Sequence, residues 1–322
     1  MRWARSIRGQ AIIGPVIEDH GGGVVAIDSR MNGWERITAV YYLPGPRPAI
    51  IETAPATSLE HVLSGLEEAG ASDLDWIVLT HIHLDHAGAA GHLAQRFPRA
   101  RVVVRAEGAP HLADPSRLWQ SASRLYDDME GLWGRMLPVS PDRIDAVSAD
   151  GVVADLGDGR RLEAVYTPGH AAHHMALFDR EGGDLFTGDA LGVYLSELGA
   201  IHPATPPPEF DLEAALDSIE RLRALGARRV FPTHFGALPK IEPLFDEASQ
   251  RLRDAVSIAE KVVAGGGGLE EVAEAYRTEE ESRVGRLDAR LAERLARTTS
   301  YELNARGIAR YLTKRRGIEV PA

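Results

Sequence analysis

The stretch Thr80-His81-Ile82-His83-Leu84-Asp85-His86 decides how the rest of the chain is interpreted. It holds four candidate metal ligands, three imidazoles and one carboxylate, within six positions. The apolar segment Trp76–Leu79 precedes it and is typical of a buried strand. Residues two apart in an extended segment point the same way, so His81 and His83 can hold one ion together. Asp85 and His86 then turn toward a neighbouring position, which predicts a second ion there.

Three further segments share this layout, in which an apolar strand runs into a threonine and then into a ligand-type side chain. They are Val165-Tyr166-Thr167-Pro168-Gly169-His170, Leu185-Phe186-Thr187-Gly188-Asp189 and Val230-Phe231-Pro232-Thr233-His234. Side chains just beyond the carboxyl ends of sheet strands are the expected place for a site in an α/β fold. The threonine hydroxyls can orient the ligands by hydrogen bonds. The four segments together predict one metal centre.

The pattern between these segments predicts sheets covered by helices, an α/β layered domain. Helices are expected at 57–70, with Thr57 as N-cap and Glu60 completing a capping box, at 87–97 and at 212–225. Strands are expected at 11–17, 37–43, 48–53, 76–80, 101–105, 151–154, 161–167, 174–178, 184–187 and 229–231.

Composition excludes several classes of protein. The 322 residues carry a net charge of −11, with 44% hydrophobic residues and no cysteine. Disulfides, thiolate ligands and cysteine nucleophiles are therefore excluded. No apolar run approaches the ~18 residues of a membrane span, and the first 20 residues do not resemble a signal peptide. We therefore expect a cytoplasmic protein with no membrane partner.

Two segments stand apart from the strand–helix alternation. Residues 118–137 carry apolar side chains at spacings of three and four, which predicts one helical face that is either core, a lid over the site, or the seam of a homodimer: Trp119, Ala122, Tyr126, Met129, Trp133 and Met136. From about Pro239 the chain is helical in pattern, broken by Gly265–Gly268. The part from Arg251 onward carries +2 and the part before it −13. This balance argues against a nucleic-acid partner.

These blocks resemble the metallo-β-lactamase fold superfamily, and in particular its dinuclear hydrolases. The resemblance covers about residues 11 to 236. It implies a four-layer αββα sandwich with a helical insertion near 112–140 and a helical C-terminal extension, divided into a catalytic domain, 1–238, and the extension, 239–322. By motif, His81, His83 and His170 would hold one metal. Asp85, His86 and His234 would hold the second, and Asp189 would bridge the two.

The resemblance also implies a type of reaction. Differences between this sequence and particular branches of the family reduce the number of candidate reactions. The best-known β-lactamases have a cysteine where Asp189 stands here, and flavodiiron proteins have glutamate where His83 stands. The blocks look most like lactonases and thioesterases of the glyoxalase II type. We expect a hydroxide shared by two divalent ions, zinc or else iron or manganese, to cleave an ester-type bond (EC 3.1) in a lactone or carboxylic ester. The alternatives are a thioesterase, an iron-dependent persulfide dioxygenase and a non-catalytic scaffold.

Substrate contacts are predicted at three positions. Tyr194 can donate its hydroxyl to a developing oxyanion, as a tyrosine does in some lactonases of the family, or can serve packing alone. His202 in the following loop can reach the substrate, and Phe235 can line the pocket floor. Because few cations accompany the aromatic residues, we expect a small neutral ester rather than a polyanion. Together with Asp85 and Asp189, Tyr194 completes the predicted catalytic residues.

Overall fold

A computed structural model describes residues 16–195, 199–238, 241–285 and 287–321. Its first sheet contains seven strands in chain order: β1 (Ile17–Asp19), β2 (Val25–Asp28), β3 (Ala39–Leu43), β4 (Ala49–Ile51), β5 (Trp76–Val78), β6 (Arg101–Arg105) and β7 (Ile144–Val147). Strands β1 to β4 pair antiparallel, and β4 to β7 pair parallel. The expected strand at 11–17 lies almost wholly outside the described residues.

The second sheet has five strands in the order β14 (Arg229–Pro232), β11 (Asp184–Gly188), β10 (Met175–Asp179), β9 (Arg160–Tyr166) and β8 (Gly151–Gly157). Its β11 and β14 run parallel, so the segments that follow them leave the same edge. Between β11 and β14 the chain forms a separate antiparallel ribbon of two short strands, β12 (Val193–Leu195) and β13 (Ala200–His202).

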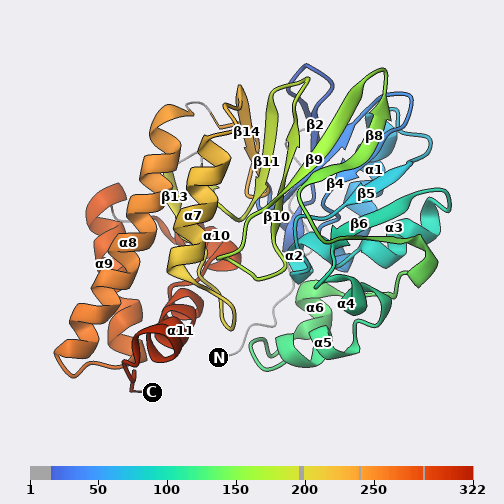
Figure 1. Cartoon of the computed structure of the whole chain (residues 1–322). Helices are drawn as coiled ribbons and strands as arrows, with labels where there is room; N and C mark the ends of the chain where they lie inside the picture. Colours follow the sequence, from blue (N-terminus) through green and yellow to red (C-terminus); the bar gives the residue numbers. More distant parts are fainter. Residues whose placement is uncertain (1–15, 196–198, 239–240, 286, 322) are drawn as a thin grey trace.

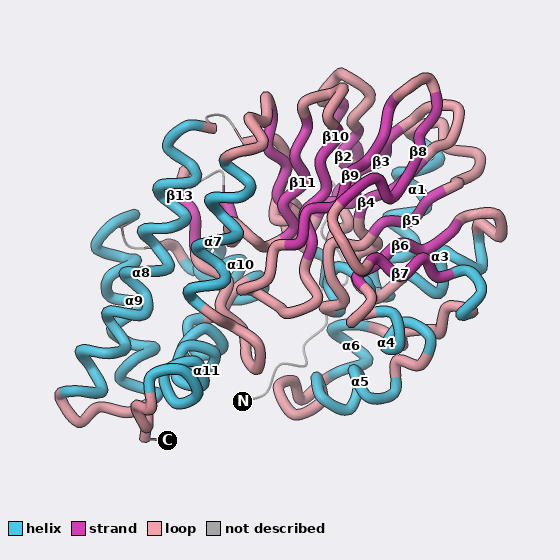
Figure 2. Tube along the Cα trace, in the orientation of Figure 1, coloured by secondary structure: helices cyan, strands magenta, loops and turns pink. Residues whose placement is uncertain are grey.

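The helices fall into two groups, one for each sheet. The first group is α1 (Leu59–Glu68), α2 (Leu84–Ala87), α3 (Ala90–Arg96), α4 (Ala109–Ala113), α5 (Ser116–Ala122) and α6 (Met129–Trp133). The second is α7 (Leu212–Arg223), α8 (Glu242–Ala264), α9 (Leu269–Val284), α10 (Ala289–Thr298) and α11 (Tyr301–Tyr311). Figure 1 shows the groups on opposite sides of the strands, and Figure 2 shows the strands gathered between them.

The alternation of side chains along the strands produces four layers. In β3, Val40 and Tyr42 pack under the first group of helices, whereas Tyr41 faces the opposite sheet. In β14, Val230 faces the second group of helices and Phe231 faces inward. Because successive side chains along a strand point to opposite faces of the sheet, each strand contributes to the core between the two sheets and to the core under the helices. The fold is the expected αββα sandwich with a helical C-terminal extension.

The extension shares its core with the second sheet. Leu185 of β11, Ile219 of α7, Phe245 of α8 and Ile308 of α11 belong to one buried cluster. Helix α8 ends at Ala264 and α9 begins at Leu269, so the glycine run separates two helices as expected. The boundary at 238/239 stays a prediction. Among the described residues, no helix is both long and apolar enough to cross a bilayer.

Two local predictions are wrong. The capping box at 57–60 does not form, because a 3₁₀ turn precedes α1 and the Thr57 hydroxyl donates to the Leu132 carbonyl at 3.1 Å instead. The apolar stripe at 118–137 does not lie on one helix. Helix α5 ends at Ala122, and α6 begins anew where the Asp128 carboxylate accepts from the Gly131 backbone N–H. The stripe's side chains nevertheless pack against one core, which is the first of the three alternatives considered for them.

A candidate dinuclear metal centre

The first group of candidate ligands joins the two sheets. His81 and His83 follow β5 of the first sheet, and His170 follows β9 of the second. The Nδ1 atom of His83 lies 2.9 Å from Nε2 of His81 and 3.0 Å from Nε2 of His170. All three imidazoles therefore direct one nitrogen at a common point, as a shared cation requires.

The second group lies beside the first. Asp85, His86 and His234 bring one ligand atom each to within 4.8 Å of one another. The Oδ2 atom of Asp85 lies 3.6 Å from Nε2 of His86 and 3.6 Å from Nε2 of His234. Asp85 and His86 come from the short helix α2, and His234 follows β14 of the opposite sheet.

The carboxylate of Asp189 faces both groups, one oxygen to each. Its Oδ2 lies 3.5 Å from Nε2 of His170. Its Oδ1 lies 3.5 Å from Nε2 of His86 and 3.6 Å from Nε2 of His234. This is the arrangement that a bridging carboxylate needs.

In His170 and His234, the ring nitrogen that faces away from the centre, Nδ1, is hydrogen-bonded to a backbone carbonyl. The Nδ1–H of His170 donates to the Ala204 carbonyl at 2.9 Å, and that of His234 donates to the Ile37 carbonyl at 2.7 Å. These bonds set the tautomer in which Nε2 keeps its lone pair for the centre.

Glu52, which was not identified from the sequence, supports both groups. It follows β4, is fully buried and has a φ of 68°. Its Oε1 accepts from Nδ1–H of His86 at 3.0 Å and from the hydroxyls of Thr80 at 2.5 Å and Thr233 at 3.0 Å. Since the Thr80 proton goes to Glu52, Thr80 Oγ1 accepts from Nδ1–H of His81 at 3.0 Å. Glu52 lies close enough to His81 and His86 to form a third candidate group of ligands, but its Oε1 already has three donors.

His173 and His174 follow the ligand motif without joining either group. The backbone N–H of Asp189 donates to Nε2 of His174 at 3.1 Å, so Nδ1–H of His174 donates to the Thr167 hydroxyl at 2.7 Å. His174 therefore holds the bridging carboxylate in place. The Nε2 atom of His173 lies 3.5 Å from the Glu209 carboxylate.

Burial and mutual charge set the protonation of the cluster. Burial and the neighbouring imidazoles hold the pKa of His81 and His83 well below the ordinary 6.5. Burial would raise the pKa of Asp189, but the imidazoles of His86 and His234 outweigh it and hold the pKa well below 3.8. For His86, burial is outweighed by the carboxylates of Asp189, Asp85 and Glu52, which raise its pKa well above 6.5. At neutral pH the first group thus offers neutral imidazoles, and the bridging carboxylate is ionised.

The donor set fits divalent cations. Nε2 of His86 and Oδ1 of Asp189 are buried and lack a hydrogen-bond partner among the described residues. An unpaired polar atom in the interior is costly unless a cation or a hydrogen-bond partner satisfies it. Imidazole nitrogen with carboxylate oxygen is a set that suits zinc, iron or manganese.

The substrate contacts predicted at Tyr194, His202 and Phe235 stay predictions, and the structure gives the surroundings of each side chain. Phe235 packs between the sheets, with the Arg36 guanidinium 4.5 Å from its ring centroid. His202 is buried, and its Nδ1 lies 2.6 Å from the carboxylate of Glu280 on α9. Tyr194 packs against the core shared with the extension, where burial and the nearby Glu247 raise its pKa. None of the three has a described contact with the ligand groups, apart from the Tyr194 backbone N–H, which donates to the His234 carbonyl at 2.8 Å.

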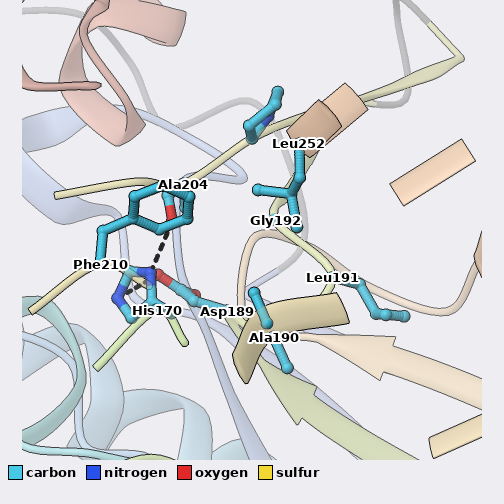
Figure 3. Close-up of a pocket in the computed structure, with 10 residues that line it drawn as sticks. His170, Asp189, Ala190, Leu191, Gly192, Ala204, Phe210 and Leu252 are labelled. Carbon is cyan, nitrogen blue, oxygen red and sulfur yellow. Dashed lines mark hydrogen bonds and ion pairs between the residues drawn. The ribbon is translucent and has the colours of Figure 1, made fainter. Parts of the chain in front are cut away.

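Two other features border the centre. Burial and the charge of the Asp85 carboxylate raise the pKa of Tyr126 in the insertion, and the Tyr126 ring contacts Trp133 at a centroid distance of 5.1 Å. Beside His170 and Asp189 lies a small cavity of about 10 Å³ with mostly apolar walls, including Phe210 and Leu252. Figure 3 shows Phe210 beside His170 and the bond from His170 to Ala204.

Comparison with known proteins identifies relatives. A family model described as the metallo-beta-lactamase superfamily matches residues 33–234. The metallo-beta-lactamase fold-containing protein ST1585 of Sulfurisphaera tokodaii is 32% identical over 210 residues, 64% of this chain and 76% of that protein. Its crystal structure superposes with a TM-score of 0.64 at 26% identity, covering 85% of this chain and 93% of that one.

Two relatives have named activities. A hydroxyacylglutathione hydrolase of Synechococcus is 32% identical over 61% of this chain, and an atrochrysone carboxyl ACP thioesterase of Aspergillus fumigatus is 26% identical over 61% of it. The matches span 62% and 51% of those two proteins, less than two thirds of either. The structure of TTHA1429 from Thermus thermophilus, with a TM-score of 0.57 at 23% identity and covering 86% of this chain and 88% of that one, shares the fold.

Proposed function

The chain belongs to the metallo-beta-lactamase superfamily, and from that membership we propose that it is a dinuclear metal-dependent hydrolase of an ester-type bond, with a lactone or carboxylic ester as substrate. The observation that carries the proposal is the position of Asp189, whose two oxygens face separate ligand groups. His81, His83 and His170 would hold one ion, and Asp85, His86 and His234 the other.

The residues of the chain prepare this centre for its ions. Bound divalent ions would supply Lewis acidity and a water of lowered pKa. Glu52 and the carbonyls behind His170 and His234 keep the ligand nitrogens aimed at the centre. The low pKa values of His81 and His83 keep both rings neutral, so one nitrogen of each ring carries no proton and is free to bind a metal.

The walls around the centre favour a substrate of low charge. We propose that the insertion, in which Tyr126 packs against the buried Trp133, borders the substrate and offers it few charges. A net charge of −13 before Arg251 would repel a polyanion. We also propose zinc as the native ion, a small-molecule substrate and a cytoplasmic location, supported by the ligand set and by the absence of cysteine.

A thioester is the second candidate bond. It is favoured by the two relatives named as a hydroxyacylglutathione hydrolase and an acyl carrier protein thioesterase. A thioester carbonyl presents the same oxygen to the centre as an ester carbonyl does. The side chains around the metal centre would therefore determine which of the two bonds is cleaved.

A hydrolysis screen tests the proposal. Protein loaded with Zn²⁺ is assayed against lactones, carboxylic esters, thioesters and phosphodiesters, and metal content is measured on the same sample. We expect turnover of an ester or lactone that is lost in the metal-free protein. Turnover of thioesters alone would select the second candidate. Absence of turnover in every class, with two ions bound, would favour a non-catalytic scaffold, and oxygen uptake with a persulfide in iron-loaded protein would favour a dioxygenase.

A further inference from the structure

The carbonyl that orients His170 belongs to a loop without regular structure. Ala204 accepts from Nδ1–H of His170 at 2.9 Å, and residues 203–206 are neither helix nor strand. A loop of this kind takes its position from the bonds that other parts of the chain make to it. Those bonds come from the C-terminal extension.

Asn304 of α11 holds the loop on both sides of Ala204. Its amide nitrogen donates to the Pro203 carbonyl at 3.0 Å, and its Oδ1 accepts from the Thr205 backbone N–H at 2.8 Å. The same nitrogen donates to the hydroxyl of Thr299 at 2.7 Å, and that hydroxyl donates to the Pro203 carbonyl at 3.1 Å. Asn304 is 3% exposed, so these bonds are shielded from water and cannot be replaced by solvent.

A glycine lets the helix approach this closely. Gly307 lies inside α11, where glycine is unfavourable compared with alanine. A Cβ atom at this position would lie 1.8 Å from the Thr205 carbonyl oxygen and 2.8 Å from the carbonyl carbon of Pro206. Contact with the loop is therefore the physical reason for a glycine here.

His234 has a similar support, which comes from helix α10. The guanidinium of Arg294 donates to the Arg36 carbonyl at 2.8 Å, and the next carbonyl along, that of Ile37, accepts from Nδ1–H of His234 at 2.7 Å. His170 and His234 belong to different ligand groups. In each ligand group, therefore, one histidine is hydrogen-bonded to a backbone carbonyl. The C-terminal extension makes hydrogen bonds to the backbone next to that carbonyl.

We propose that the C-terminal extension positions the metal centre, and that Asn304 is the positioning residue for His170. The inference rests on the proposed function, because it takes His170 as a metal ligand. Asn304 acts through the 203–205 backbone, which fixes the direction of the His170 ring. Arg294 acts in the same way on the side of His234.

The test measures metal affinity in the full-length chain. Zn²⁺ binding is followed by competition with a chromophoric chelator for wild type, Asn304→Leu and Gly307→Ala. Loss of a bond that orients a ligand typically weakens metal affinity 10–100-fold, and Asn304 is one step further away, so a loss on the order of tenfold is expected. Gly307→Ala should show the same loss although alanine favours the helix. The visible spectrum of the Co²⁺-loaded variants, which reports ligand geometry, should change with the affinity.

Two controls separate positioning from stability. Tyr276→Phe removes a buried hydroxyl of α9 that has no described hydrogen-bond partner, and it should leave Zn²⁺ affinity unchanged. Ile308→Ala opens a cavity in the core beside α11, so it should lower the unfolding temperature with little change in affinity. Equal losses of affinity in Ile308→Ala and Asn304→Leu, or wild-type affinity and spectrum in Asn304→Leu, would overturn the inference. Absence of tight Zn²⁺ binding by the wild type would instead reject the metal centre itself.

Discussion

The carboxylate of Glu52 accepts a hydrogen bond from Nδ1–H of His86 at 3.0 Å, and both side chains are fully buried. Through the hydroxyl of Thr80 the same carboxylate also orients His81. One residue behind the candidate ligands thus orients a histidine in each ligand group. The centre depends on this support as well as on the ligands.

Glu52→Gln should weaken metal binding while leaving the fold intact. The amide keeps the size of the side chain but loses the charge and part of the acceptor capacity that hold His86 and His81. An affinity loss of about 10–100-fold is expected from chelator competition. Glu163→Gln is the matched control, because Glu163 pairs with Arg180 at the exposed surface. Equal affinities in the two variants would remove Glu52 from the support of the site.

His83→Ala should lose metal and activity together. Nδ1 of His83 lies 2.9 Å and 3.0 Å from the other two nitrogens of its group, so its removal opens the group on one side. Elemental analysis of the purified variant should find about one ion fewer per chain than in wild type, and hydrolysis should fall at least about a hundredfold. His61→Ala on α1, outside the site, is the control. Full metal content in His83→Ala would show that the ligand assignment is wrong.

The metal-free protein should lose stability as the pH falls below about 6.5. Burial lowers the pKa of His81, His83, His170 and His174, and it lowers that of His173 to about 4. Between pH 6.5 and about 4 the unfolded chain therefore binds protons that the folded chain does not, which favours unfolding. His86 acts in a different pH range, because its raised pKa gives a stabilisation that is fully present below pH ~6.5 and is lost as the pH rises above it.

Thermal unfolding of chelator-treated protein at a series of pH values from about 7.5 to about 4.5 measures this effect. The midpoint should fall as the pH drops from about 6.5 to about 4.5. Zn²⁺-loaded protein should resist the fall until protons displace the ions. A midpoint that stays level or rises as the pH drops from about 6.5 to about 4.5 would contradict the lowered pKa values of the buried histidines.

An apolar ester should be a better substrate than a phosphodiester. The mostly apolar walls of the cavity beside His170 and Asp189 and the negative charge of the chain before Arg251 both favour a neutral molecule. The measurement is kcat/KM for an apolar lactone or ester against a phosphodiester at equal metal loading. A higher value for the phosphodiester, falling steeply with added salt, would contradict the prediction.

The candidate ligands were accessible from sequence because each ligand segment begins where an apolar strand ends. His81, His170 and His234 are conspicuous by residue type, and the parallel strands β11 and β14 bring Asp189 and His234 to one edge. Glu52 also follows a strand, β4, but a lone carboxylate is common on any surface. Only the pairing of β4 with β5 puts it behind the histidines.

The parts that could not be predicted depend on long-range packing. The insertion has the apolar spacing of one helix, yet Asp128 starts a new helix there. His202 pairs with Glu280, which lies far along the chain on α9, and no local pattern reports such a partner. The hydrogen bonds between Asn304 and the 203–205 loop likewise join residues that lie far apart in the sequence.

The ligand segments leave both sheets, which has a consequence for the protein's life in a cell. Ions held by His81 and His170 would act as a removable cross-link between the halves of the sandwich. Where the ion is scarce, the cross-link would be open more often, and proteases would reach the chain more readily. The amount of this protein would then follow metal supply even at a constant rate of synthesis.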